Sequence, residues 1–170
     1  MDELQRVPPE KHVPVHAVRV LLDDVRSRHN VGSIFRSADA FGIAGLDLCG
    51  FTPCPPHREI EKTALGATST VPWEQHMDTV ARVLQLKAQG HTVFAVEQTM
   101  LAKPLHEVVV PDGPVAIVLG NELSGVSDHV IQACDACIVI PQFGSKHSLN
   151  VSVCAGIVLW WLVMGHHPLK

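Results

Sequence analysis

The chain contains short, continuous runs of apolar residues separated by polar or amphipathic stretches. Unbroken apolar runs bounded by turn residues are typical of strands buried on both faces of a parallel sheet, whereas a half-exposed strand alternates apolar and polar positions. The predicted strands are Ala17–Leu22, Leu46–Cys49, Thr92–Val96, Val115–Leu119 and Ala136–Ile140.

Between these runs, apolar residues recur at helical spacing. In the first such stretch Asn30 is a predicted helix N-cap and Gly42 a helix end, and the apolar positions between them are Val31, Ile34, Phe35, Ala38 and Phe41. Further helices are expected in Glu59–Thr70 (a short helix and a connection), Met77–Gln89 and Asp128–Ala133. Strands that alternate with helices predict an α/β domain whose parallel sheet is covered on both faces.

The last third of the chain combines a buried strand, a polar loop and a long apolar helix. The loop covers Gln142–His147, and the helix is expected to begin at Ser148. Ser148 and Asn150 carry side-chain oxygens that satisfy free N–H groups at a helix start. Because the stretch Leu149–Met164 is apolar on all sides, we expect it in the core or in a dimer interface. An open α/β sheet binds its ligand in loops of this kind.

Composition supports a single globular domain and narrows the classes of partner. The chain has 170 residues, 46% of them hydrophobic and 18% charged, with a net charge of −4. We expect an extended N-terminal arm over residues 1–16 and one domain over 17–170. No stretch predicts a membrane span or a signal peptide, so a cytoplasmic protein is expected. The negative charge argues against non-specific coating of nucleic acid but leaves room for RNA binding at a local patch.

The five cysteines do not predict a metal site. Cys134 and Cys137 form a CxxC pair, but Cys49 and Cys54 are five positions apart and followed by prolines. A four-thiolate zinc site requires a second pair at closer spacing. A cytosolic setting also disfavours disulfides. We therefore expect neither a bound metal nor a disulfide.

Three polar, glycine-containing segments follow or flank the predicted strands. They read HNVGSIFRSADAFG, LGNELSG and IPQFGSKHSLN. The fingerprints GxGxxG and GxxxxGK[ST] are both missing from the sequence, which weakens a dinucleotide-binding or nucleotide-triphosphatase interpretation. Glycines that let backbone approach a ligand, paired with polar side chains, indicate a different small-molecule site.

These segments resemble the three motifs of the SpoU (TrmH-like) family of RNA ribose 2′-O-methyltransferases, within the SPOUT class. The first motif covers Asn30–Gly42, the second Leu119–Gly125 and the third Ile140–Asn150. The likeness extends over Ala17–Trp161, nearly the whole chain, and the three motifs occur in the family's order.

The resemblance implies a parallel-sheet SPOUT fold with a C-terminal deep trefoil knot, an exception to the rule that chains avoid knots. It also implies that S-adenosylmethionine lies in the knot, held mainly by backbone groups, and that a homodimer partner completes the RNA site. The cofactor-binding residues carried over from the family are Val96, Leu119, Gly120, Ile140 and Leu149.

The resemblance further implies a catalytic set and an RNA-binding set. The catalytic residues are Arg36, Asn30, Glu122, Ser148 and Asn150, and the RNA-binding residues are Arg26, Arg28, Arg36 and Lys146. Because an arginine is a poor general base, we expect Arg36 to hold the 2′-oxygen or a phosphate in line with the sulfonium methyl group. The alternatives are structural: Arg36 covering apolar core, Asn30 only capping its helix, and Glu122 only anchoring its loop.

The expected function is methyl transfer from S-adenosylmethionine to a ribose 2′-hydroxyl of structured RNA, with tRNA preferred because a minimal catalytic domain suits a compact substrate. Two alternatives remain. The substrate is rRNA, or the chain is a non-catalytic RNA-binding or assembly protein with the same fold. Cofactor affinity discriminates between the enzyme and the binding protein.

Overall fold

The computed structural model describes residues 14–146 and 148–166, and its centre is a seven-stranded parallel sheet. The strand order is β3-β2-β1-β6-β4-β7-β5, and each neighbouring pair is parallel. The strands are β1 (His16–Asp23), β2 (Ile43–Cys49), β3 (Trp73–His76), β4 (Thr92–Val96), β5 (Lys103–Pro104), β6 (Val115–Leu119) and β7 (Ala136–Val139). The expected parallel α/β class is confirmed.

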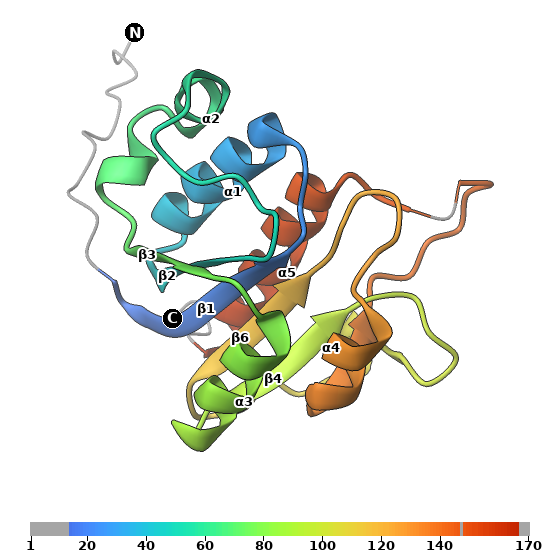
Figure 1. Ribbon diagram of the computed structural model, residues 1–170. Coiled ribbons are helices and arrows are strands. Elements are labelled where there is room, and N and C mark those ends of the chain that lie inside the picture. The colour runs from blue at the N-terminus through green and yellow to red at the C-terminus, as the bar shows by residue number, and fades with distance from the viewer. Residues whose placement is uncertain (1–13, 147, 167–170) are drawn as a thin grey trace, which may run out of the picture.

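Helices cover both faces of the sheet (Figure 1). They are α1 (Arg28–Ala40), α2 (Arg58–Ala64), α3 (Thr79–Ala88), α4 (Asp128–Ala133) and α5 (Val151–His166), with 3-10 turns η1 (Ala67–Ser69) and η2 (Leu105–Glu107). One hydrophobic cluster joins the sheet to α1, α2 and α5, and a second joins the opposite face to α3 and α4. This three-layer arrangement explains why the central strands are apolar on both sides.

The two strands that the sequence pattern did not predict lie at the two edges of the sheet. β3 reads WEQH. Its first and last residues, Trp73 and His76, are half-buried, and the two residues between them are exposed. β5 consists of Lys103 and Pro104, and proline is tolerated at a sheet edge because it has no N–H to donate to the ladder. Edge strands lack the continuous apolar run by which the central strands were recognised.

Two predicted helix starts were wrong. The N-cap of α1 is Ser27, whose hydroxyl accepts a bond from the backbone N–H of Asn30 at 3.2 Å, so Asn30 lies inside the first turn. Helix α5 begins at Val151 instead of Ser148. Asn150 precedes it, and its Oδ1 accepts the backbone N–H of Ser152 at 2.9 Å. Asn150 thus bonds a free N–H group at the start of α5, as expected. The N-cap of α1 lies three residues before the predicted Asn30.

Helix α5 is apolar all round, but the chain buries only one side of it. Ala155, Val158, Leu159 and Leu162 are fully buried. A stripe on the other side, which we call the α5 stripe, consists of Val153 (51% exposed), Ile157 (38%) and Trp160 (58%). The core therefore accounts for half of the apolar helix, and the α5 stripe is left facing outward.

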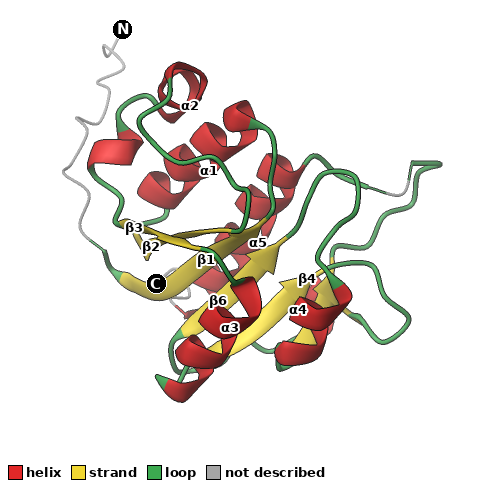
Figure 2. Cartoon of the chain, in the orientation of Figure 1, coloured by secondary structure: helices red, strands yellow, loops and turns green. Residues whose placement is uncertain are grey.

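The carboxyl ends of the central strands β1, β6, β4 and β7 all point toward one edge of the sheet, where long loops follow them (Figure 2). In an open α/β sheet this edge is where ligands bind. Residues 1–13 of the predicted N-terminal arm lie outside the described residues. Within the described part of the chain, no helix has the length and apolar character needed to cross a bilayer.

Candidate active site

A cavity of about 460 Å³ opens at the carboxyl edge of the sheet. Its walls are the segments that follow β4, β6 and β7 and the residues that lead into α5. All five residues predicted to bind a cofactor line it: Val96, Leu119, Gly120, Ile140 and Leu149. The volume lies within the range of ordinary small-molecule sites. The structure thus brings the second and third motifs together around one space.

The wall after β6 is a tight loop built around Asn121. The backbone N–H groups of Asn121 and Gly125 bond each other's carbonyl oxygens at 3.1 and 2.8 Å. The Asn121 amide donates to the carbonyl of Asp24 at 2.8 Å, which fixes the loop against the end of β1. A Cβ at Gly120 would collide with the backbone of Gly125 and Val126. The glycine is required because the loop folds back on itself, and the fold leaves backbone groups at the cavity wall.

Glu122 joins this loop to the start of α1. Its carboxylate accepts the backbone N–H groups of Arg26 and Ser27, each at 3.0 Å, and the Asn30 side-chain amide at 3.1 Å. Partial burial raises the Glu122 pKa, but these hydrogen bonds outweigh that effect, so the pKa lies below its ordinary value. Glu122 is therefore charged at neutral pH, and it anchors the loop while also lining the cavity.

Two further side chains extend this contact to the third motif. The Asn150 amide donates to Asn30 Oδ1 at 3.2 Å. The Asn30 side chain therefore accepts one hydrogen bond, from Asn150, and donates one, to Glu122. These two bonds link residues of all three motifs. Ser148 is exposed and lines the cavity beside Asn150. Four of the five predicted catalytic residues thus lie at or directly beside the cavity.

The fifth, Arg36, does not line the cavity. It is exposed on α1, and within residues 14–146 and 148–166 no hydrogen bond or ion pair involves its guanidinium. Arg26 is exposed next to the Glu122 contact, and Arg28 pairs with Glu59 at 3.5 Å. Lys146 is exposed and lines a second, smaller cavity of about 250 Å³ beside the first. None of the predicted RNA-binding residues lines the main cavity.

Glu97 is a cavity residue that the sequence did not single out. It follows β4 directly, lines the main cavity, and accepts the backbone N–H of Val126 at 3.0 Å. A lone carboxylate after a strand gives no sign in the sequence of the loop that it will contact. Only the fold places β4 next to β6.

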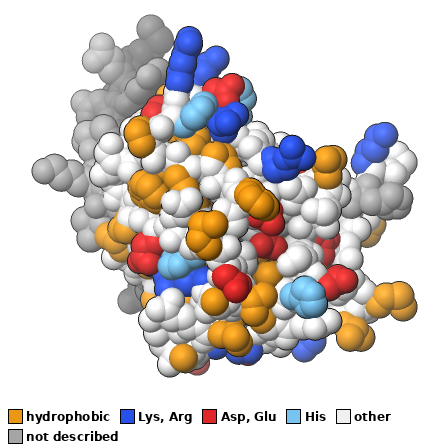
Figure 3. Space-filling view, viewed as in Figure 1, with side chains coloured by type: hydrophobic (Ala, Val, Ile, Leu, Met, Phe, Trp, Pro, Cys, Tyr) orange, Lys and Arg blue, Asp and Glu red, His pale blue; other side chains and the backbone are white. Residues whose placement is uncertain are grey.

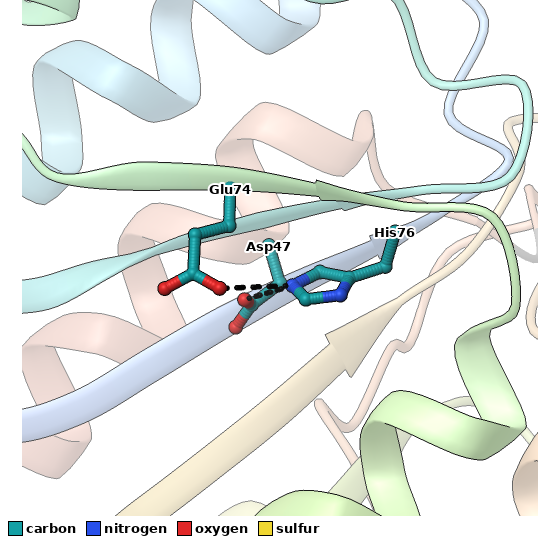
Figure 4. A group of neighbouring side chains, drawn as sticks. All are labelled: Asp47, Glu74 and His76. Atoms are coloured by element: carbon teal, nitrogen blue, oxygen red, sulfur yellow. Dashed lines mark hydrogen bonds and ion pairs between the residues drawn. The ribbon is translucent and has the colours of Figure 1, made fainter.

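A second group of charged side chains lies away from the cavity, on β1, β2, β3 and α3. Asp47 is fully buried and lies near Glu74 and His76, and together these three could offer atoms to a metal (Figure 4). Arg19 and Arg82, however, each contact the Asp47 carboxylate at 2.8 to 3.0 Å. Two guanidinium groups at a carboxylate occupy the place and supply the charge of a cation, so we interpret this group as a buried ion network.

The cysteines behave as packed thiols. All five are free, and burial raises the pKa of each, to about 12 for Cys49 and Cys134 and to about 11 for Cys154. Thiols with such pKa values are protonated at neutral pH and react slowly. Cys134 and Cys137 pack against the cluster of α3 and α4, and Cys154 against that of α1 and α5.

A parallel sheet covered by helices on both faces, with a cavity at the carboxyl ends of β4, β6 and β7, is the arrangement in which doubly wound α/β proteins bind small molecules. The chain matches the sequence model of the SpoU rRNA Methylase family over residues 17–160, and it belongs to that family. The resemblance noted in the three motifs is confirmed.

Individual relatives are similar over most of the chain. A putative TrmH family tRNA/rRNA methyltransferase of Staphylococcus haemolyticus is 32% identical, over 88% of this chain and 59% of its own. The 23S rRNA (guanosine-2′-O-)-methyltransferase RlmB of Nitrosomonas europaea is 35% identical, over 85% of this chain and 55% of its own. The chain thus spans somewhat more than half the length of these relatives.

Solved structures are similar over the same region. The TrmH/SpoU tRNA modifying enzyme of A. aeolicus has a TM-score of 0.81 at 30% identity, covering 91% of this chain and 77% of its own. An AdoMet-bound rRNA methyltransferase of Sinorhizobium meliloti has a TM-score of 0.83 at 28% identity, covering 98% and 63%.

Proposed function

We propose that the protein transfers a methyl group from S-adenosylmethionine to a ribose 2′-hydroxyl of structured RNA, most directly tRNA, with rRNA as the alternative substrate. The observation that carries this proposal is the convergence of all three family motifs on one cavity, joined through Asn150, Asn30 and Glu122. Similar proteins are named as tRNA and as rRNA methyltransferases, which supports the reaction and leaves both RNA classes open.

The cavity suits a ligand of net positive charge. Among the described residues that line it, Glu97 and Glu122 are carboxylates and none is Lys, Arg or His. The backbone at Gly120 packs closely against that of Gly125 and Val126, which leaves backbone N–H and C=O groups at the cavity wall. These groups are suited to bind the uncharged adenine ring of S-adenosylmethionine. When bound, S-adenosylmethionine supplies an electrophilic methyl group on a positively charged sulfur. Val96, Leu119, Gly120, Ile140 and Leu149 are the residues that we propose hold it.

The residues around the cavity have separate tasks in this proposal. Glu122 and Asn30 fix the second motif against the first, and Asn150 fixes the third, so the groups that face the substrate keep their positions. Ser148, exposed at the cavity, is placed to bond the substrate ribose. In the transfer the ribose 2′-oxygen would form a bond to the methyl carbon as the carbon–sulfur bond breaks, the sulfur would leave as the neutral thioether of S-adenosylhomocysteine, and the hydroxyl proton would pass to solvent water.

Arg36 requires a second subunit to reach the chemistry. It lies outside the cavity of its own chain, and α1 packs directly on α5. The α5 stripe begins one turn after Leu149, which lines the cavity. We propose that a second copy of the chain covers this stripe, forming a homodimer in which Arg36 of the partner subunit borders the cavity. An exposed apolar helix face supports such an interface.

The RNA-binding surface is proposed to lie beside the cavity. Lys and Arg side chains lie over α2 and the start of α1 at the top of Figure 3, interspersed with acidic and histidine side chains. Arg26, Arg28 and Lys146 are exposed, on both sides of the cavity. Phosphate contacts from such residues position an RNA without reading its sequence. A local patch of this kind lets a chain of net charge −4 bind RNA.

We also propose a C-terminal knot and a cytoplasmic location. The return of Asn150 to Asn30, 120 residues earlier in the chain, supports a C-terminal segment that passes among the cavity loops. A crystal structure traced through residues 115–166 tests the knot. A chain that lies against those loops without passing through one would contradict it.

The proposed reaction is tested by incubating the protein with labelled S-adenosylmethionine and purified tRNA or rRNA, followed by nucleoside digestion and mass spectrometry. We expect a 2′-O-methylnucleoside in one of the two fractions, with tRNA as the preferred substrate. Saturable cofactor binding without transfer to either RNA would contradict the proposed substrates. If the cofactor also failed to bind, the non-catalytic alternative would replace the enzyme.

Subunit mixing tests the placement of Arg36. The variants Arg36→Ala and Asn150→Ala should each lose transfer, by about 100-fold or more for Arg36→Ala, because orientation and charge stabilisation are lost. A mixed dimer contains one cavity with an intact Asn150 and an intact Arg36 from the other subunit. Recovery of transfer when the two variants are mixed supports action across the interface. Absence of recovery in the mixed dimer contradicts it. Trp160→Glu should give a monomer in light scattering.

A further inference from the structure

Glu97 sits at the junction of the strands that wall the cavity. Its backbone N–H donates to the carbonyl of Ile138 at 3.1 Å, and its own carbonyl accepts the thiol of Cys137 at 3.3 Å. Both partners belong to β7, the neighbour of β4 in the sheet. The main chain at Glu97 is therefore held firmly at the carboxyl edge.

The side chain of Glu97 reaches the opposite wall. Oε1 accepts the N–H of Gln98 at 2.7 Å, and Oε2 accepts the N–H of Val126 at 3.0 Å. Gly125, at φ +72°, lies against the carboxylate so closely that a Cβ there would collide with it. One carboxylate thus links the end of β4 to the far end of the loop 120–126, while Glu122 anchors the near end to α1.

Within residues 14–146 and 148–166, no cationic side chain pairs with Glu97. The hydrogen-bond donors to its carboxylate are neutral backbone groups. Two bonds leave lone pairs free on a carboxylate that has about four acceptor sites. A cavity that Glu97 lines together with Glu122 therefore has a negative potential, which favours a cation over a neutral ligand of the same shape.

We propose that Glu97 is a positioning and specificity residue: its carboxylate holds the loop 120–126 in place, and its charge makes the cavity prefer S-adenosylmethionine to S-adenosylhomocysteine. This inference rests on the proposed function. The substrate carries a sulfonium and the product a neutral thioether, so the two differ by one positive charge and one methyl group. The same carboxylate that attracts the cofactor gives no electrostatic help to the spent product, which favours its release.

The test compares the affinities of both ligands in Glu97→Gln by isothermal titration calorimetry. The substitution removes the charge and keeps a side-chain oxygen that can accept one N–H. The loss of one N–H contact should weaken both ligands, and we expect the affinity for S-adenosylmethionine to fall about fivefold to tenfold more than that for S-adenosylhomocysteine, because only the former also loses the charge interaction. The matched control is Glu107→Gln, which removes the same charge from an exposed residue outside the cavity lining and should change neither affinity.

A purely structural role predicts a different result, in which both affinities fall by the same factor. Equal losses, or no loss, in Glu97→Gln would overturn the charge preference. Glu97→Asp keeps the charge on a shorter side chain that no longer reaches Val126, so both ligands should weaken together and their ratio should stay at the wild-type value. This second variant also gives a result if Glu97→Gln does not fold. Failure of the proposed function is a separate outcome, because the wild-type protein would then bind neither ligand.

Discussion

Two groups of carboxylates in this protein have opposite surroundings. Asp47 is completely buried and is met by two arginines and His76, so its charge is cancelled by side chains. Glu97 and Glu122 line the cavity and are met by backbone N–H groups and an amide, so their charge persists. A carboxylate whose hydrogen-bond partners are cationic belongs to a structural cluster. A carboxylate whose partners are neutral can still attract a cationic ligand.

The difference has an energetic reason. A buried charge must be paired, because the loss of solvation costs several kcal/mol per ion. A partly exposed carboxylate is still solvated, and neutral donors are enough to hold it in place. The cluster around Asp47 should therefore govern stability, and the cavity carboxylates should govern binding and transfer.

The largest effect on stability is expected for Asp47→Asn. The variant leaves the guanidinium groups of Arg19 and Arg82, 14% and 6% exposed, without a counter-charge in the interior. Breaking a buried ion network in this way costs about 3 to 5 kcal/mol of the free energy of unfolding. Urea denaturation followed by circular dichroism measures it.

The control for Asp47→Asn is Glu74→Gln in the same cluster. Glu74 is 57% exposed and lies 3.8 Å from both arginines, so the loss should be about 1 kcal/mol or less. Similar losses for the two variants would mean that burial does not distinguish their roles.

Transfer activity is expected to fall in Glu122→Gln without a comparable loss of stability. A neutral amide cannot accept the N–H groups of Arg26 and Ser27 together as the carboxylate does, so the second motif shifts against the first. A displacement of about 1 Å costs on the order of 10- to 100-fold in rate. The free energy of unfolding should change by less than about 1 kcal/mol, because the side chain is exposed. Labelled-methyl transfer and urea denaturation are measured on one preparation.

Glu107→Gln again serves as the charge-matched control, and its transfer rate should equal that of the wild type. If Glu122→Gln instead lost several kcal/mol and kept its rate, Glu122 would belong with Asp47 as a structural residue, and the distinction between the two groups would fail.

The sequence predicted the central strands well, because burial on both faces produces apolar runs such as Val115–Leu119 that are visible without the fold. It could not predict the contacts made by charged residues. Arg19, Asp47 and Arg82 are separated by 28 and 35 positions, and only the order β3-β2-β1 with α3 packed on it brings them together. Glu97 was missed for the same reason. Glycines and polar residues beside the strands indicated a small-molecule site, but the individual roles of the motif residues came only from the family spacing.

The smallest expected effect is the pH dependence of the Glu122 contact. Hydrogen bonds hold the Glu122 pKa below its ordinary value despite partial burial, so the carboxylate is bound more tightly when charged. The contact should contribute fully above the unfolded-state pKa of about 4.3 and be lost as the pH falls through the lower folded-state pKa. Backbone amide NMR shifts of Arg26 and Ser27 should therefore titrate together at a pH below the ordinary range of a glutamate, and should stay constant in Glu122→Gln. The corresponding stability difference between the two proteins should be below about 1 kcal/mol because the group is largely exposed. Amide shifts that titrate equally in the variant would show that another group controls this contact.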